Sequence, residues 1–315
     1  MNRIIPLLFL SILIFSCSQS NEAVEKTDQV IIAKGSYITP LGKTFELSEP
    51  SARLLEQYEE AKANFEGDPN DLVKIIWYGR RTAYLGRYED AIDIYSEGIE
   101  SFPSEPKLYR HRGHRFISLR EFDKAIADLE KAAELIQGTE NEIEPDGMPN
   151  ALNIPVSTLH GNIYYHLGLA YYLTHDYEKA YESYLKCRES GSRYDNIVSS
   201  THWLYMIQQR LKDPEKADLM LAPINVDSTV IENQSYADLC ELYKGWLPVD
   251  SLLQEGPANP SNDAVRYGVA NWFLYNGDTA RAKELMWKMM DGSSYTSFGY
   301  LAAESDLMEY FEAND

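Results

Sequence analysis

The chain repeats itself with a period of 34 residues. Two successive units, 72–105 and 106–139, place a glycine at position 8, an alanine at position 20 and a large residue at position 24. A third unit, at about 160–192, has the same pattern. Self-similarity at a fixed period of this length is typical of two-helix units stacked side by side. The period therefore predicts an all-α solenoid.

The repeated residues are those that close helix packing requires. Small residues at positions 8, 20 and 27 let two helices approach each other, and large residues at positions 17 and 24 fill the space between them. The residues at positions 8 and 24 are, in chain order, Gly79 and Tyr95, Gly113 and Leu129, and Gly168 and Tyr184. This pattern resembles the tetratricopeptide repeat (TPR). The resemblance implies an α-α superhelix whose concave groove is lined by the first helix of each unit.

The resemblance extends over most of residues 40–315. The segments GRRTAYLGRY, YRHRGHR and THWLYM are similar to a set of bacterial TPR proteins. This similarity supports the predicted fold but implies no particular function. Ala217 indicates a less regular unit that starts near Ser199, and a last unit starts near Asp263. Further helices are expected at 51–65, 234–243, near 251, and at 297–311, where the last helix would cover the exposed end. We expect 51–315 to form one repeat domain.

The N-terminus resembles a bacterial lipoprotein signal. Residues 1–16 contain an apolar stretch that is too short to span a bilayer as a helix. The sequence Ile14–Cys17 resembles a lipobox, which implies that the signal is removed and that the Cys17 thiol receives a diacylglycerol. By similarity to enteric lipoproteins, Ser18 after the lipidated cysteine favours delivery of the protein to the outer membrane. We expect a chain anchored by lipid in the bacterial cell envelope; the alternative is an ordinary signal peptide with an incidental cysteine.

Residues 17–50 connect this anchor to the repeats. The segment 18–33 is polar and acidic, as expected of a flexible tether. The segment 35–42 alternates turn residues with apolar ones, so it is expected to pack on the array. The whole chain has a net charge of −20. Because this charge repels the phosphate backbone, nucleic acid is a poor candidate for a partner. No spacing of Cys and His resembles a zinc site, and we predict neither a metal nor a cofactor.

The groove is the surface where a ligand is expected. Positions 2, 5, 9 and 12 of each first helix form one stripe, flanked by positions 6 and 13. The predicted ligand-binding residues on this stripe are Trp77, Arg80, Arg110, His111, His114, Tyr165, His166, His202 and Trp203. Arginine binds carboxylate or phosphate, histidine donates hydrogen bonds, and aromatic faces pack on sugars or apolar side chains. A protein or peptide ligand is the first hypothesis, and a glycan or an anionic small molecule is the alternative. A solvated inner face without a ligand would also fit.

An insertion interrupts the period between the second and third units. Ala125 and Ala180 occupy equivalent positions 55 residues apart, which is 21 more than one period. The extra segment, about 138–159, is rich in proline and is expected to be ordered. Its polar candidates for the groove are Glu144, Asp146, Asn150 and Asn153. A carboxylate beside His114 or His166 would permit acid–base chemistry, so a hydrolase is the third hypothesis. No catalytic residue is predicted, because no spacing is specific for one.

Overall fold

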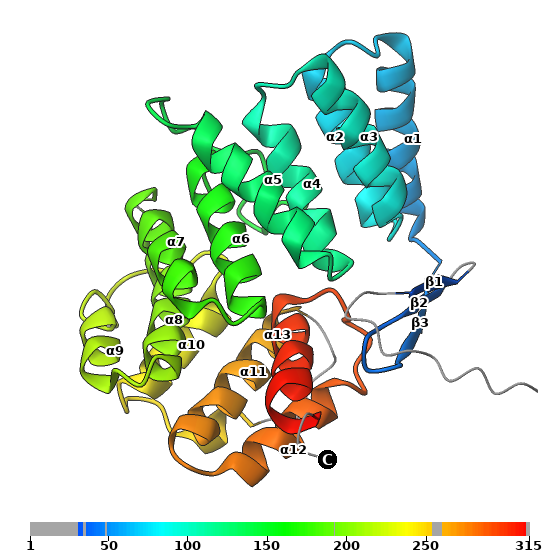
Figure 1. The fold of residues 1–315 in the computed structure, drawn as a ribbon. Coiled ribbons are helices and arrows are strands. Elements are labelled where there is room, and N and C mark those ends of the chain that lie inside the picture. Colours follow the sequence, from blue (N-terminus) through cyan, green and yellow to red (C-terminus); the bar gives the residue numbers. More distant parts are fainter. Residues whose placement is uncertain (1–30, 34–35, 48, 192, 254–259, 313–315) are drawn as a thin grey trace, which may run out of the picture.

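The computed structural model describes residues 31–33, 36–47, 49–191, 193–253 and 260–312. The predicted signal 1–16, the predicted lipidation site Cys17 and the start of the tether lie outside the described residues. Within the described part the chain is an α-α superhelix with a small sheet at its N-terminal end (Figure 1). None of the helices described there is long and apolar enough to cross a membrane.

Three regular helix pairs form the first half of the array. They are α2 (Leu72–Tyr84) with α3 (Tyr88–Ser101), α4 (Pro106–Ser118) with α5 (Phe122–Leu135), and α6 (Leu159–Leu173) with α7 (Tyr177–Glu189). Helix starts follow local chemistry, since the Asp71 side chain accepts hydrogen bonds from the Val73 and Lys74 N–H groups, and Thr158 caps α6 through the Gly161 N–H. The boundaries of these units are therefore encoded locally.

Glycine at position 8 permits close approach within each pair. A Cβ atom added to Gly79 would overlap the Tyr95 ring, and one added to Gly168 would lie 2.7 Å from the Tyr184 ring. The partner rings come from position 24 of the same unit, as the period predicts. The alanines at position 20 are fully buried. The residues that recur in the sequence are thus the ones that pack the two helices of each unit together.

The remaining helices are less regular. They are α1 (Ala52–Gly67), α8 (Tyr194–Arg210), α9 (Pro214–Met220), α10 (Gln234–Tyr243), α11 (Pro260–Tyr275), α12 (Thr279–Met289) and α13 (Phe298–Asp306), with a 3-10 turn η1 (Val249–Ser251) and a π-helical segment η2 (Leu307–Glu312). Helix α10 has the predicted bounds, whereas α8 begins five residues before Ser199. The pairs α8–α9 and α11–α12 correspond to the two irregular units.

The last helix folds back into the array. Helix α13 packs against α11 and also against α6 of the third regular unit (Figure 1). A buried ion pair fixes this position, because Arg120 Nε lies 2.8 Å from Glu304 Oε2 and both side chains are 2% exposed. Arg120 also donates to the Tyr295 carbonyl, just before α13. The prediction that this helix covers the exposed end is therefore wrong: α13 lies inside the curve.

A small N-terminal sheet joins the first regular unit to the loop before α13. Strands β1 (Ile31–Ala33), β2 (Ser36–Ile38) and β3 (Thr44–Glu46) are antiparallel in that order. In β2 the buried Tyr37 donates a hydrogen bond from Oη to the Gly86 carbonyl (2.6 Å) in the first regular unit. In β3 the Phe45 ring stacks on Tyr295 at 4.5 Å, beside α13. We call residues 36–47 the N-terminal clasp.

Candidate ligand-binding cleft

The insertion enters the groove and is held there by arginines. Arg80 Nη1 donates to the Pro145 carbonyl and Arg81 Nη1 to the Gly147 carbonyl, each at 2.9 Å. These bonds bring the carboxylate of Glu144 over α4, where the residue is only 5% exposed. The chain's own insertion therefore occupies the part of the groove between the first two regular units.

Glu144 lies against two of the predicted groove residues. Its Oε2 is 3.4 Å from Arg110 Nε, and its Oε1 is 3.4 Å from His111 Nε2. Asn162 Nδ2 also donates to Oε2, at 2.8 Å. The insertion carboxylate thus approaches a histidine, as the hydrolase hypothesis requires, but an arginine and an amide already bind it.

The geometry fixes the proton on His111. Arg110 Nη1 lies 2.8 Å from His111 Nδ1, and because a guanidinium only donates, Nδ1 must accept. The ring proton is then on Nε2, which faces Glu144. Burial, followed by the charge of Arg110, holds the pKa of His111 well below its usual value. His111 is therefore neutral near pH 7 and serves as a bridge between Arg110 and Glu144.

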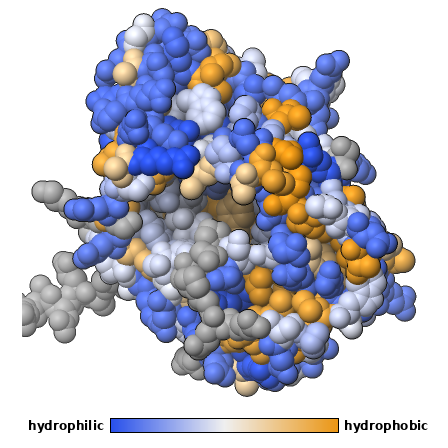
Figure 2. Space-filling view, turned by 180° about the vertical axis from the view of Figure 1, so that it is seen from behind, coloured by the Kyte–Doolittle hydropathy of each residue, from blue (hydrophilic) through white to orange (hydrophobic). Residues whose placement is uncertain are grey.

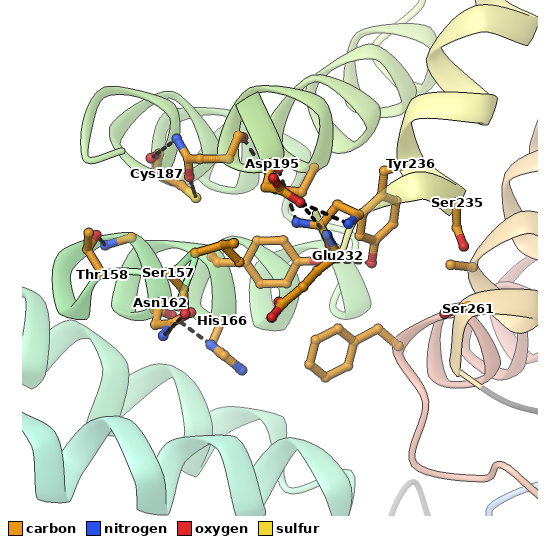
Figure 3. A pocket seen from close by; sticks show the side chains of 18 residues that line it. Ser157, Thr158, Asn162, His166, Cys187, Asp195, Glu232, Ser235, Tyr236 and Ser261 are labelled. Atoms are coloured by element: carbon orange, nitrogen blue, oxygen red, sulfur yellow. Dashed lines mark hydrogen bonds between the residues drawn. The ribbon is translucent and has the colours of Figure 1, made fainter. Parts of the chain in front are cut away.

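Two adjoining hollows remain beside this cluster, and we call them together the cleft. The first, of about 330 Å³, lies between α6, α8, α10, α11 and α13 (Figure 3). The second, of about 470 Å³, lies between α2, α4 and the insertion. The two hollows share Ser157, Asn162 and Glu232. Figure 2 shows a face of the molecule that is hollowed near its middle, with hydrophilic and hydrophobic residues around the hollow.

His166 lines the first hollow, and its Nε2 atom is buried. Its Nδ1 lies 2.6 Å from the Asn162 carbonyl, which only accepts, so Nδ1 carries the proton (Figure 3). Burial, followed by the charge of Arg110, holds the pKa of His166 well below its usual value, so the ring is neutral. Nε2 is then a bare lone pair. It has no hydrogen-bond partner among the described residues, although His166 is only 4% exposed.

Aromatic rings form one wall of the first hollow. Trp203 Nε1 donates to Tyr165 Oη at 2.8 Å, and Tyr165 Oη lies 2.9 Å from Tyr236 Oη. Either of the two tyrosine hydroxyls can be the donor in the bond between them. The Phe298 ring of α13 meets the His166 ring edge-on at 5.6 Å. The wall is apolar apart from hydroxyl groups that already have partners.

The mouth of the cleft is shaped by the loop before α10. Asp195 of α8 accepts hydrogen bonds from the backbone N–H groups of Ile231, Glu232 and Asn233. Figure 3 shows the Asp195 and Glu232 side chains at this place. These bonds hold the exposed Glu232 side chain at the rim. Asn150 of the insertion donates to Glu232 Oε1 at 2.5 Å, so the two rims are joined. Burial raises the pKa of Glu232, an effect that the Asn150 hydrogen bond opposes.

The structure brings most of the predicted site residues together. Those that line the cleft are Arg80, Arg110, Glu144, Asp146, Asn150, Tyr165 and His166. His111 lies beneath Glu144, and the His114 ring lies 4.3 Å from the His166 ring. These two histidines belong to the same cluster without lining the hollows.

Four predicted residues lie elsewhere. His202 and Trp203 are each 1% exposed, because α10 and α11 pack over the inner face of α8. His202 Nδ1 pairs with Tyr243 Oη at 3.0 Å, so this side chain belongs to the core. Trp77 lines a separate hollow against α1, with the Arg80 guanidinium stacked 4.5 Å above its ring. Asn153 is exposed with φ 53°, and it forms a turn in the insertion.

The sequence prediction missed several residues of the cleft. They are Ser157, Asn162, Glu232, Tyr236 and Phe298. Asn162 stands at position 2 of the third unit, so the groove stripe itself pointed to it. Tyr236 and Phe298 reach the cleft only because α10 and α13 fold inward, and the repeat period does not encode that contact.

Cys187 lines the first hollow. Cys187 and Cys240 are both free and buried, and burial raises the pKa of the Cys187 thiol to about 12. Across the residues that the structure describes, no group of three or more His, Cys, Asp and Glu side chains is arranged to hold a metal ion.

Comparison with known proteins gives partial matches along the chain. Residues 161–189 match the family model described as tetratricopeptide repeat. Tetratricopeptide repeat protein 12 of Mus musculus is 29% identical over 141 residues, which cover 45% of this chain and 16% of the mouse protein. The match thus spans about a sixth of the length of that relative.

Among solved structures, the similarity is remote. A tetratricopeptide repeat protein from Parabacteroides merdae is 14% identical, with 79% of this chain and 92% of that one covered and a TM-score of 0.46. YrrB, a TPR protein with an unusual peptide-binding site, is 14% identical, with 79% and 98% covered and a TM-score of 0.43. BtubC from P. vanneervenii is 16% identical, with 82% and 91% covered and a TM-score of 0.43.

The repeat units themselves identify the family. Residues 161–189 contain α7 and most of α6, the pair in which Gly168 meets Tyr184. The two preceding units have the same helix pair and the same contact between positions 8 and 24. The chain is therefore a tetratricopeptide-repeat protein.

Proposed function

We propose that this chain is an envelope-anchored TPR lipoprotein that binds a segment of a partner protein in the cleft. The fold is that of a protein scaffold, and the cleft is where its inner surface remains open beside the insertion. The observation that carries the proposal is the cleft itself, in which two adjoining hollows share Ser157, Asn162 and Glu232 beside the aromatic ring of Phe298. Concave sites with an apolar wall and a few convergent polar groups are where ligands bind most often.

The ring geometry favours a peptide over a glycan. A sugar-binding groove would present flat rings in one plane, on which pyranose faces stack. The Tyr165 ring is instead perpendicular to Tyr184 (86°) and tilted by 38° from Phe298. The lining of the two hollows contains Asn150, Asn162 and several serines, and such side chains suit the hydrogen bonding of an extended peptide.

The polar cluster supports binding more than hydrolysis. A general base works best when its pKa lies near the working pH. His166 has a free lone pair on Nε2, but burial and the charge of Arg110 hold its pKa well below that range. Glu144 is the insertion carboxylate nearest to a histidine, and Arg110 and Asn162 already bind it. Its role in the proposed scaffold is to hold α4, α6 and the insertion together around the cleft.

The anchoring part of the proposal depends on the N-terminal sequence. Residues 1–17 resemble a lipoprotein signal with Cys17 as the acceptor of the lipid, and Ser18 favours the outer membrane. Replacing Cys17 by Ser should move the chain from the membrane pellet to the soluble fraction of the producing cells. A Cys17→Ser chain that still sediments with the membranes would contradict lipid anchoring.

The binding proposal is tested by filling the cleft. Ser235 lines the first hollow, so Ser235→Trp should occupy it. Val226 is 69% exposed outside the cleft, and Val226→Trp is the matched control. Mature chain (17–315) with Cys17→Ser is used to capture proteins from an envelope extract of the source cells. We expect a partner that the parent chain and Val226→Trp retain and that Ser235→Trp loses. Equal capture by all three folded chains would overturn the proposal.

A further inference from the structure

The two hollows of the cleft differ in their lining, and together they limit the kind of ligand that the cleft can hold. The first hollow has an apolar wall at Tyr236, Ala264 and Phe298. Its volume of about 330 Å³ is at the lower end for a small-molecule site, so it accommodates one or two side chains rather than a folded element. The second hollow, of about 470 Å³, is lined mainly by polar and charged residues. A ligand that fills both hollows therefore carries an apolar group beside a polar one.

The charged residues of the lining are mostly acidic. They are four carboxylates and two arginines, namely Glu144, Asp146, Asp195, Glu232, Arg80 and Arg110. Arg110 is ion-paired with Glu144, with 3.4 Å between Nε and Oε2. Burial raises the pKa of Asp146, and the nearby charge of Arg80 opposes that shift. The two arginines thus balance the two carboxylates of the insertion, and the charges of the other two carboxylates remain.

Asp195 and Glu232 have only neutral partners. Asp195 is 1% exposed, and the backbone N–H groups of residues 231–233 stabilise its carboxylate without cancelling the charge. Glu232 accepts a hydrogen bond from the Asn150 amide. In the part of the chain that the structure describes, neither carboxylate is ion-paired. Burial is the main cause of the raised pKa of Glu232; the Asn150 hydrogen bond opposes it, and the charges of Asp146 and Asp195 add to it. The potential at Glu232 is therefore negative.

The positive charges of α4 act at the opposite end of the cleft. Burial, followed by the charge of Arg110, lowers the pKa of His166, and Arg115 adds to this effect. An anionic ligand does not gain from Arg110, because Glu144 and His111 already bind its guanidinium. A cationic group is favoured at Glu232, which is the charged residue that lines both hollows.

We propose that the cleft recognises a segment of the partner in which a lysine or arginine lies next to an apolar residue. The apolar side chain fills the first hollow against Phe298, and the cation lies at Glu232, where the two hollows meet. This inference rests on the proposed peptide-binding function and names the class of ligand. It replaces the anionic ligand that the basic stripe suggested. The net charge of −20 also draws a basic segment toward the chain.

Short peptides separate a preference for charge from a preference for shape. Acetyl-phenylalanyl-arginine amide and acetyl-arginyl-phenylalanine amide place a guanidinium on either side of a phenyl ring. In the neutral counterparts citrulline replaces arginine, because it keeps the shape and loses the charge; in the anionic ones glutamate replaces it. Each peptide is titrated into the mature Cys17→Ser chain and followed by ligand-observed NMR. We expect the tighter arginine peptide to bind at least five-fold more tightly than its two counterparts. Equal affinities, preference for glutamate, or no binding by any peptide would overturn the inference.

Two double variants assign the preference to the cleft. Asp146→Asn with Glu232→Gln removes two charges and keeps a carbonyl acceptor for Asn150, so the preference for arginine should fall below two-fold. The control is Asp123→Asn with Glu178→Gln, which removes the same charge from exposed positions on α5 and α7 outside the lining. The control should keep the preference. Loss of the preference in both variants, or in neither, would refute the role of the cleft carboxylates.

A further variant tests the location should the first double variant fail to fold. Ser235→Trp fills the first hollow and should abolish binding of the arginine peptide, whereas Val226→Trp should leave it unchanged. Binding retained by folded Ser235→Trp would refute the inference. If Ser235→Trp abolishes partner capture while the peptides show no preference for charge, the proposed function stands and this inference falls.

Discussion

The regular units and the C-terminal region are built from similar helices but have different cores. In residues 72–189, contacts between sequence neighbours bury glycine, alanine and large apolar side chains. In residues 194–312, α10, α11 and α13 turn inward, and polar side chains are buried with them. Those that are at most 2% exposed include His202, Gln208, Asp263, Asn271, Glu304 and Asp306. The regular units also bury some polar pairs, such as Arg112 with Asp128, but the inward fold buries more polar side chains to 2% exposure or less.

Asp306 shows how these buried polar side chains are paired. Arg210 Nε and Nη2 donate to Asn271 Oδ1, and Arg210 also pairs with Asp306. Tyr267 Oη donates to Asp306 at 2.8 Å. Burial alone would raise the pKa of Asp306, but the charge of Arg210 and the contact with His175 outweigh it and lower that pKa. The network joins α8, α11 and α13 in one arrangement.

The largest effect should come from breaking the buried pair that closes the array. Glu304→Ala leaves Arg120 without its carboxylate at 2% exposure, and removing one partner of a buried pair costs about 3–5 kcal/mol. Urea unfolding followed by circular dichroism measures the loss. Asp291→Ala is the control, because its pair with Lys43 is exposed and worth about 1 kcal/mol or less. Similar costs for both variants would show that the buried pair does not secure the inward fold.

The second effect concerns the pH dependence that one buried histidine gives the C-terminal region. His111, His114 and His166 of the regular units have lowered pKa values too, so the test compares variants at His202 alone. Burial lowers the pKa of His202 to about 3, whereas an unfolded histidine has a pKa near 6.5. Between these values only the unfolded chain binds the proton, so stability falls as the pH falls. From pH 6.5 to 5 this histidine accounts for a loss of about 2 kcal/mol.

His202→Phe should remove that part of the pH dependence while the ring still stacks on Tyr243. The loss of the hydrogen bond to Tyr243 lowers stability at every pH and does not change the slope. Free energies of unfolding at pH 5, 5.75 and 6.5 test this, and identical slopes for the parent chain and the variant would contradict it.

The smallest effect tests the regular units. Gly79→Ala pushes a Cβ atom into the Tyr95 ring, and overpacking costs about 1–3 kcal/mol. Better helix propensity returns about 0.5–1 kcal/mol, so the net loss should be about 1 kcal/mol. Gly67→Ala is the control, since nothing lies within 4 Å of the added atom. Thermal unfolding should show a lower midpoint for Gly79→Ala alone; equal midpoints would mean that position 8 tolerates a side chain.

The repeat pattern predicts the fold well where contacts are local. The six regular helices and α10 follow from the period and the apolar spacing, and α1 lies where a helix was expected at 51–65. The cleft was partly predictable for the same reason. Arg80 and Arg110 lie on the stripe of the first helices, and the break in the period locates the insertion that carries Glu144.

The rest depends on contacts between residues far apart in the chain. Nothing in the spacing around His202 and Trp203 distinguishes them from Tyr165 and His166, which occupy the equivalent face of an earlier unit. Their burial is decided by α10 and α11, and Phe298 reaches His166 from 132 residues away in sequence. A sequence period describes only the interface between one unit and the next. It therefore does not predict that α10, α11 and α13 fold toward the inner face of the array.

The N-terminal clasp gives the array a mechanical property. An open solenoid stretches like a spring, because small rotations at successive interfaces add up along its axis. Here Tyr37 is bonded to Gly86 while Phe45 is stacked on Tyr295, so the first regular unit and the loop before α13 are tied to one short segment. The rotations at all interfaces must then sum to a fixed value. Widening the cleft at one interface requires compensating twists at the others, and every repeat shares the elastic cost of admitting a ligand.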